Sequence, residues 1–164
     1  FTGENDFFVN PDLLFRGKQT TVEYWAYVTA ADVGNRSAFN VGEADESTNR
    51  FQAHAPWRDR KVFFDFGDTR AGGRLEAAYD NALDGWNHVA LTSNGIDDMK
   101  VYFNGVQVAQ SSFAGSPSEQ SSVTIGGNRV GRFLFRGLMS DFRLWNEVRS
   151  AQQIRAGMYD RLPS

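Results

Sequence analysis

The sequence contains no cysteine, only two histidines and no long apolar run. Without cysteine, and with His54 and His88 far apart, the ligand clusters of zinc sites are not supported. The absence says little about the redox compartment, because oxidising surroundings permit disulfides without requiring them. No segment approaches the roughly 20 apolar residues of a membrane helix, and no basic-then-apolar leader is visible. We therefore expect a soluble chain without membrane insertion, whose export signal has been removed or lies outside this sequence.

A surplus of basic residues is also missing. The formal net charge is −3 at pH 7 and the isoelectric point is near 5.4. Because binding to nucleic-acid phosphates requires a basic stripe, we expect no nucleic-acid partner. The densest basic stretch, Arg58-Asp59-Arg60-Lys61, has an acid inside it and is typical of a solvated turn.

Aromatic residues are plentiful, with 14 Phe, 5 Tyr and 4 Trp among 164 residues. This content suits a strand-rich protein and also a surface that stacks on flat ligands. With 41% hydrophobic residues, the chain is large enough to bury a core without disulfide or metal staples. We expect a single domain over residues 1–164.

Residues 86–110 contain three strand-like runs separated by two turn signals, Asn94-Gly95 and Asn104-Gly105. Asn and Gly tolerate the positive φ of a two-residue type I′ turn. The second turn then pairs Phe103 with Val106 and Val101 with Val108. One face of this hairpin is apolar and is expected to lie on a core; its residues are Met99, Val101, Phe103, Val106 and Val108.

Two other runs predict which side chains face the core. In residues 20–28, Val22, Tyr24, Ala26 and Val28 form one face, and Glu23, Trp25 and Tyr27 form the other. In residues 135–145, Leu138, Phe142 and Leu144 face one way, and Met139, Asp141, Arg143 and Trp145 face the other.

Short strand-like runs with turn residues between them recur along the whole chain. A capping-box spacing at Ser150-Ala-Gln-Gln153 predicts one short C-terminal helix. No helical crossovers separate the strands, so the pattern predicts an all-β, two-sheet antiparallel sandwich rather than a parallel α/β sheet. Asn10-Pro11-Asp12 predicts a turn, and residues 13–18 a connector. The expected strands are residues 1–9, 20–28, 37–41, 51–55, 61–66, 74–78, 86–93, 99–103, 106–110, 123–126 and 135–145.

The order of several motifs resembles the laminin-G-like branch of the concanavalin A-like lectin/glucanase superfamily. The motifs are Phe1-Thr-Gly-Glu-Asn-Asp-Phe-Phe-Val, Thr21-Val-Glu-Tyr-Trp-Ala-Tyr-Val, Trp86-Asn-His-Val-Ala-Leu, Val101-Tyr-Phe-Asn-Gly-Val, Ile125-Gly-Gly-Asn and Phe135-Arg-Gly-Leu-Met-Ser-Asp-Phe-Arg-Leu-Trp-Asn-Glu-Val-Arg-Ser. Residues 52–67 also resemble a segment of secreted bacterial members. The resemblance implies a jelly roll, often an accessory domain of extracellular enzymes or adhesins, but it does not imply one ligand.

The resemblance also implies a structural calcium ion between the first and last strands. Its ligands would be Asp141 and oxygens near Gly3 to Asp6, since Ca²⁺ takes several oxygen ligands, many of them backbone carbonyls. The alternative is that Asp141 pairs with Arg136 or Arg143 on a solvated strand.

A mixture of aromatic and polar side chains predicts a carbohydrate-binding surface. Sugars stack their flat C–H faces on aromatic rings, while their hydroxyls need carboxylate, amide or imidazole partners. Trp57, beside Pro56 and among charges, is the best candidate for exposure, whereas Trp25 and Trp86 also fit a packing role. An exposed aromatic residue can equally mark a protein interface. The candidate ligand-binding residues are Trp57, His54, Asp59, Trp25, Tyr27, Glu23 and Tyr102.

No catalytic residues are predicted. Glycosidases of this fold carry paired carboxylates on alternate residues of one strand, in a Glu-x-Asp-x-x-Glu arrangement. The nearest approach is Asp65-Phe66-Gly67-Asp68, whose spacing puts the two carboxylates on opposite faces of a strand. No serine-nucleophile arrangement is recognisable, and His88 is expected to be structural.

The sequence thus predicts a non-catalytic, extracellular carbohydrate-binding or adhesive module of a larger secreted protein, with a polysaccharide or cell-surface glycan as partner. The alternatives are a protein-interaction or spacer domain without a small ligand and, less favoured, a glycan hydrolase or lyase.

Overall fold

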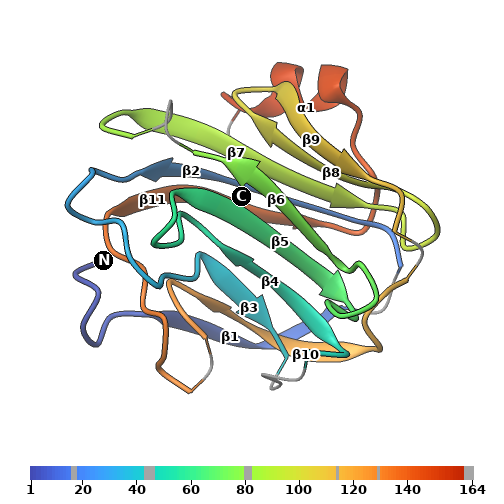
Figure 1. Cartoon of the computed structure of the whole chain (residues 1–164), viewed down its shortest axis with the longest axis horizontal. Coiled ribbons are helices and arrows are strands. Elements are labelled where there is room, and N and C mark those ends of the chain that lie inside the picture. The colour runs from blue at the N-terminus through green and yellow to red at the C-terminus, as the bar shows by residue number, and fades with distance from the viewer. Residues whose placement is uncertain (16–17, 43–46, 80–82, 114, 129, 161–164) are drawn as a thin grey trace.

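The computed structural model describes residues 1–15, 18–42, 47–79, 83–113, 115–128 and 130–160. Figure 1 shows two layers of strands with a short helix at one end. The elements are β1 (Phe8–Phe15), β2 (Thr20–Tyr27), β3 (Phe39–Val41), β4 (Arg50–His54), β5 (Lys61–Gly67), β6 (Arg74–Ala78), β7 (Trp86–Ser93), β8 (Met99–Phe103), β9 (Val106–Ser111), β10 (Gln120–Ile125), β11 (Leu138–Trp145) and α1 (Ala151–Gly157).

All strand pairs are antiparallel, and they form two sheets. The six-stranded sheet has the order β1-β10-β3-β4-β5-β6, and the five-stranded sheet has the order β11-β2-β7-β8-β9. The predicted all-β, two-sheet sandwich with one short C-terminal helix is therefore confirmed for the described residues.

Alternate residues of each sheet fill the space between the two layers, because side chains on a strand point to opposite faces in turn. From β2, Val22, Tyr24 and Ala26 are buried there, as predicted. Part of this core is a group of phenylalanine rings from the six-stranded sheet. Phe51 lies at its centre, with ring centroids 4.8 Å from Phe15, 5.2 Å from Phe66 and 5.7 Å from Phe39.

The N-terminal residues meet the segment that leads into β11. Thr2 forms a bridge with Arg136, and the Gly137 amide donates to the Phe1 carbonyl at 3.0 Å. The rings of Phe1 and Phe135 lie edge to face at 5.7 Å. The N-terminal residues and a segment near the C-terminal end of the sequence therefore lie side by side (Figure 1).

The prediction for the first strand is wrong in its bounds. Strand β1 starts at Phe8 and runs through the expected turn at Asn10-Pro11-Asp12 into the expected connector. Pairing with β10 shifts between Asn10 and Leu14, so this bulged edge strand accommodates the proline. Proline is tolerated at such positions because it need not donate a ladder hydrogen bond there.

The hairpin of β8 and β9 has a shifted register. Phe103 pairs with Val106 as predicted, but a shift between Val101 and Tyr102 pairs Val101 with Ala109 instead of Val108. Val106 and Val108 are exposed, whereas Met99 and Val101 are buried. The prediction of one continuous apolar face is therefore wrong for β9. A single extra residue turns Val108 away from the core, whereas Val106 keeps the predicted pairing with Phe103 and is nevertheless exposed.

A second shift, between Ser140 and Arg143 in β11, has the same effect. Met139 packs on the core while Leu138 is 54% exposed, the reverse of the predicted faces. Phe142 and Leu144 pack on the core as predicted. Asp141 lies at the shift with φ of 51°, which identifies it as the residue that absorbs the bulge.

Helix α1 begins with the predicted capping box: the Ser150 hydroxyl accepts from the Gln153 amide, and the Gln153 side chain accepts from the Ser150 amide. Its buried residue Ile154 packs with Ala90 and Tyr102 on the outer face of the five-stranded sheet. The helix therefore covers part of that face. Within the described ranges, no helix has the length and apolar character needed to cross a membrane.

The phenylalanine group predicts which substitutions destabilise the fold. Phe51→Ala should lower the free energy of unfolding by about 3–5 kcal/mol, because it leaves a cavity among fully buried rings. Phe8→Ala, the same change at a residue that is 59% exposed, should cost about 0.5 kcal/mol or less. Urea denaturation of both variants measures the difference; similar losses would contradict this description of the core.

Candidate functional site

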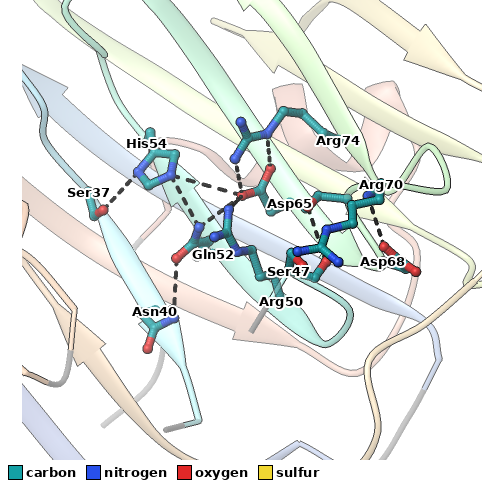
Figure 2. A network of polar contacts seen from close by, with 11 residues as sticks. Ser37, Asn40, Ser47, Arg50, Gln52, His54, Asp65, Asp68, Arg70 and Arg74 are labelled. Carbon is teal, nitrogen blue, oxygen red and sulfur yellow. Dashed lines mark hydrogen bonds and ion pairs between the residues drawn. The ribbon is translucent and has the colours of Figure 1, made fainter. Parts of the chain in front are cut away.

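One row of side chains crosses the outer face of the six-stranded sheet. Each member is the direct cross-strand partner of the next, so all stand on the face turned away from the core. From β1 to β6 the row is Val9, Thr124, Asn40, Gln52, Asp65 and Arg74. Its polar half, over β4, β5 and β6, forms the centre of the network in Figure 2.

Asp65 on β5 is the centre of this network, and its side chain has no exposed surface. Arg74 binds it through two hydrogen bonds, Nε to Oδ1 and Nη2 to Oδ2, both at 2.6 Å. Gln52 donates to Oδ2 at 2.8 Å, and Arg50 approaches at 3.4 Å. Burial by itself raises the pKa of Asp65, but the hydrogen bonds and charge of Arg74 more than offset it and hold this pKa below its usual value. The carboxyl therefore stays ionised.

His54 on β4 continues the network. The Gln52 amide group, which also donates to Asp65, lies 3.1 Å from His54 Nε2, so this nitrogen accepts. The proton is then on Nδ1, which donates to the Ser37 hydroxyl at 2.9 Å. Burial lowers the pKa of His54 to about 4; nearby Asp65 opposes the shift, while the charges of Arg74 and Arg50 add to it. The imidazole is therefore neutral at physiological pH.

Aromatic rings stand beside this polar floor. The Trp57 ring lies 4.4 Å from His54 and 5.4 Å from Phe133, measured between centroids. Trp57 follows β4 in a turn. A 2.7 Å hydrogen bond from the Arg60 amide to the Trp57 carbonyl closes this turn. Phe133 comes from a distant loop, held by a 2.6 Å hydrogen bond from the Ser37 amide to its carbonyl. Both rings are half-buried and present one side to solvent.

Together these residues line a pocket of about 350 Å³. Its floor is Gln52 and His54, its aromatic walls are Trp57, Phe63 and Phe133, and its rim is Arg50, Arg58, Asp59 and Arg74. The Arg74 guanidinium also stacks over the Phe63 ring at 5.0 Å, which fixes it at the rim. This volume lies at the lower end of the range for small-molecule sites, and the mixture of rings and polar groups is typical of them.

Ser37, His54 and Asp65 stand in a line that resembles a nucleophilic triad, with His54 Nε2 3.9 Å from Asp65 Oδ2. Ser37, however, is fully buried and does not line the pocket. A nucleophile must reach its substrate, so this hydroxyl has the geometry of a structural hydrogen-bond partner. The hydrogen bonds with Ser37 and Gln52 hold the His54 imidazole in place.

The structure divides the predicted carbohydrate surface between two sheets. His54, Trp57 and Asp59 come together in the pocket described above. The other four candidates belong to the five-stranded sheet, where Tyr102 is 4% exposed and packs beneath α1. They do not form one surface with Trp57, because β2 and β8 lie in the other layer. These four are Trp25, Tyr27, Glu23 and Tyr102.

Glu23 is fully buried and serves the packing of the C-terminal segment. It lies 2.6 Å from Arg149 Nη1 and 3.3 Å from His88 Nε2. Burial raises the pKa of Glu23, but His88 and Arg149 outweigh this effect and lower it overall. The predicted structural role of His88 agrees with this contact, and Glu23 has no surface to offer a ligand.

Trp25 and Tyr27 are half-buried on the same outer face, next to a shallow groove lined by Trp25, Trp86, Ser140 and Asp141. The Trp25 indole donates to the Met158 carbonyl at 2.9 Å, which is a packing role. Trp86 is 46% exposed and contacts the Tyr27 ring at 6.0 Å. Trp86 is therefore more accessible than its strand position indicates.

The residues implied for calcium fit the ion poorly. Asp6 is hydrogen-bonded to the Thr2 amide and hydroxyl, and Asp141 accepts from the Ser140 hydroxyl. Gly3 lies against Arg36 and Arg136, whose charges oppose a cation. Across the described ranges, no group of three or more potential acidic or histidine ligands forms. Calcium at this position stays a prediction.

The alternative role of Asp141, pairing with a neighbouring arginine, is wrong for the described residues. Arg136 pairs instead with Asp32 at 3.0 Å. Arg143 donates to the carbonyls of Gly157 and Asp160. Both arginines thus fix other segments of the chain.

Sequence reasoning missed several residues that line the pocket or lie beneath it: Arg50, Gln52, Arg58, Phe63, Asp65, Arg74 and Phe133. For β4 and β5, a signal was available, because Gln52, Phe63 and Asp65 alternate with the apolar residues that fill the core. A polar residue at such a place on a strand otherwise rich in phenylalanine indicates a polar outer face. Phe133 gives no local signal, since it lies in an irregular loop.

The buried neutral His54 predicts a loss of stability in acid. The folded chain leaves the imidazole neutral down to about pH 4, whereas the unfolded chain protonates it near 6.5. Stability is therefore complete above pH 6.5 and falls as the pH drops towards 4. Between pH 7 and 5 we expect a loss of about 2 kcal/mol in the free energy of unfolding from this group.

Urea denaturation at both pH values, in the wild type and in His54→Gln, measures this loss. The variant should lose about 2 kcal/mol less than the wild type, since titrations elsewhere are common to both proteins. An NMR titration of the wild-type imidazole reads the pKa directly. An ordinary value near 6.5, or the same acid sensitivity in both proteins, would contradict the buried neutral state.

Comparison with known proteins agrees with this architecture. A family model described as the concanavalin A-like lectin/glucanases superfamily, of the laminin-G type, matches residues 2–155. No curated protein sequence matches the chain at a significant level. Domain 4 of AbnA, a GH43 extracellular arabinanase from Geobacillus stearothermophilus solved with arabinotriose, is similar with a TM-score of 0.74 and 18% identity, over 95% of this chain and 73% of that one.

Receptor-binding domains of botulinum neurotoxins are also similar. The domain of serotype D has a TM-score of 0.67 and 14% identity, over 94% of this chain and 41% of its own. The serotype D ligand-binding domain solved with N-acetylneuraminic acid has a TM-score of 0.64 and 14% identity, over 92% of this chain and 39% of its own. At these identities the likeness shows the fold, and the chain spans about two fifths of the toxin domains. By the family model and the fold together, this chain belongs to the laminin-G-like branch of the concanavalin A-like lectin/glucanase superfamily.

Proposed function

We propose that this domain is a non-catalytic carbohydrate-binding module and that its glycan binds in the pocket over β4, β5 and β6. The observation that carries the proposal is the juxtaposition of half-buried aromatic walls with a fixed polar floor. Trp57 and Phe133 offer faces on which the C–H surface of a sugar ring stacks. The arginines of the rim offer hydrogen bonds to its hydroxyls.

The floor is held rigid before any ligand arrives. Gln52 and Asp65 are tied to each other, His54 is tied to Gln52 and Ser37, and Arg74 is tied to Asp65. Pre-organised groups lose little conformational entropy on binding, which favours affinity for a small, flexible sugar. Similar domains solved with arabinotriose and with N-acetylneuraminic acid support a glycan as the ligand class.

The state of the carboxylates supports a non-catalytic role. Glycosidases need two carboxyl groups, one of them free to give or take a proton. Beneath the pocket, Asp65 is buried, ionised and bound by Arg74, so it has no freedom to act as acid or nucleophile. Asp59 on the rim is then left without a partner carboxylate among the residues that line the pocket.

A protein-interaction surface is the second candidate, and it is favoured by one observation on the other sheet. Leu138, Tyr27 and Trp86 are cross-strand neighbours on the outer face of β11, β2 and β7. Leu138 and Trp86 are about half exposed, at 54% and 46%. Adjacent exposed apolar residues mark contact surfaces more often than scattered ones do. The same face would suit packing against another domain of a larger extracellular protein.

Replacing Trp57 tests the proposed site. Trp57→Ala should weaken glycan binding by about tenfold or more, because it removes the larger aromatic wall. The measurement is a glycan array, followed by affinity gels cast with arabinan, galactan and polygalacturonan. Far-UV circular dichroism and thermal melts check that the variant is folded.

Trp86→Ala is the matched control, since Trp86 is a half-exposed tryptophan on the opposite sheet. It should bind as the wild type does. Equal retention of wild type and Trp57→Ala, or loss of binding in Trp86→Ala alone, would contradict the assignment of the site. Release of reducing sugar from any retained polysaccharide would contradict the non-catalytic role.

A further inference from the structure

The pocket displays positive charge although the whole chain is acidic. Three arginines line it or form its rim, Arg50, Arg58 and Arg74, against one rim carboxylate, Asp59. The second carboxylate, Asp65, lies beneath the lining. His54 is neutral, so the group carries three positive and two negative charges in a chain whose formal net charge is −3. The local excess is opposite in sign to that of the molecule.

Burial decides which of these charges a ligand meets. The side chain of Asp65 has no exposed surface, whereas that of Arg74 is 37% exposed and that of Arg50 is 19% exposed. The carboxylate therefore compensates the arginines from beneath, and their guanidinium groups form the accessible layer. A ligand entering from solvent meets the cations first.

Arg74 keeps donors for a ligand while it is fixed by Asp65. A guanidinium has five N–H groups, and the two hydrogen bonds to Asp65 use one on Nε and one on Nη2. The stacking on Phe63 holds its plane at the rim. Its remaining N–H groups belong to a pre-positioned fork, the geometry that suits carboxylate and sulfate oxygens.

Arg58 supplies a second, uncommitted cation. It is exposed, it lines the same pocket, and no ion pair or hydrogen bond holds its side chain within the described residues. Its neighbour Asp59 is exposed and accepts from the Lys61 amide at 3.3 Å, which draws the carboxylate towards the turn. Arg58 can therefore reorient towards a bound anion without breaking an existing contact.

We infer that the pocket selects a sugar that carries an anionic substituent, a carboxylate or a sulfate, and that Arg58 and Arg74 are its cationic partners. This inference rests on the proposed function, which places a glycan in the pocket. The aromatic walls stack on the sugar ring, and the arginines of the rim bind its anionic substituent. A neutral sugar of the same shape gains the stacking and hydrogen bonds to its hydroxyls, but no attraction between opposite charges.

The test compares matched oligosaccharides by isothermal titration calorimetry. The probes are trigalacturonate, its methyl ester, neutral galactotriose and a sulfated galacto-oligosaccharide of similar length. Trigalacturonate or the sulfated probe should bind at least about fivefold more tightly than the two uncharged ones. That advantage should shrink when the salt concentration rises from 50 mM to about 500 mM, since salt screens partly exposed charges. Preference for one of the two anionic probes identifies the substituent.

Arg58→Gln should remove most of the preference for the anionic probe, because it lowers the affinity for that probe much more than the affinity for galactotriose. Arg155→Gln is the matched control, because it removes the same charge from α1, which packs on the other sheet. It should behave as the wild type. Arg58 is exposed and its side chain forms no hydrogen bond or ion pair with the described residues, so its replacement should have little effect on folding.

The outcomes separate this inference from the proposed function. Equal affinity for charged and uncharged probes, without salt dependence, overturns the anionic preference and leaves glycan binding in place. A preference that Arg58→Gln and Arg155→Gln reduce equally overturns the role of the pocket rim. Binding of none of the four probes or of any array glycan overturns the proposed function, and the inference with it.

Discussion

The buried carboxylate of Asp65 is the constraint around which the outer face of the six-stranded sheet is arranged. An ionised group without exposed surface must be compensated by hydrogen bonds and an opposite charge, or the fold loses several kcal/mol, on the order of 3–5. Arg74 and Gln52 provide that compensation. Once Gln52 is oriented by Asp65, the tautomer of His54 is set, and Ser37 is set by His54. The floor of the pocket is therefore one connected network (Figure 2).

This network explains how a single sheet can have a packed inner face and a recognition surface on the other. Phe51, Phe64 and Phe66 anchor β4 and β5 in the core, and the intervening residues carry the polar floor. The core residues hold the two strands in register, so the polar groups are positioned by hydrophobic packing on the opposite face. Stability and the geometry of the site share the same two strands.

The two outer faces of the sandwich differ in character. The six-stranded sheet carries charged and polar groups beside half-buried rings, whereas the five-stranded sheet is partly covered by α1 and exposes Leu138 and Trp86. Glu23, on that second face, is enclosed by Arg149 and His88, so its charge holds the C-terminal segment in place. The outer face of the six-stranded sheet therefore has the features of a ligand site, whereas the outer face of the five-stranded sheet binds helix α1 of the same chain.

Local sequence patterns were enough to predict the class of fold, most strand positions, the capping box of α1 and the buried face of β2, because alternation and turn chemistry are properties of adjacent residues. They also pointed to Trp57, His54 and Asp59. Other features became visible only in three dimensions. The candidates Trp25, Tyr27, Glu23 and Tyr102 lie on the opposite sheet. Asp65 lies between Gln52 and Arg74 on neighbouring strands, and Phe133 lies beside Trp57 in the wall of the pocket. The shifts in β9 and β11 likewise reversed the faces of Val108, Leu138 and Met139. Strand order, register and the approach of distant loops depend on contacts between segments far apart in the chain, and no local pattern carries that information.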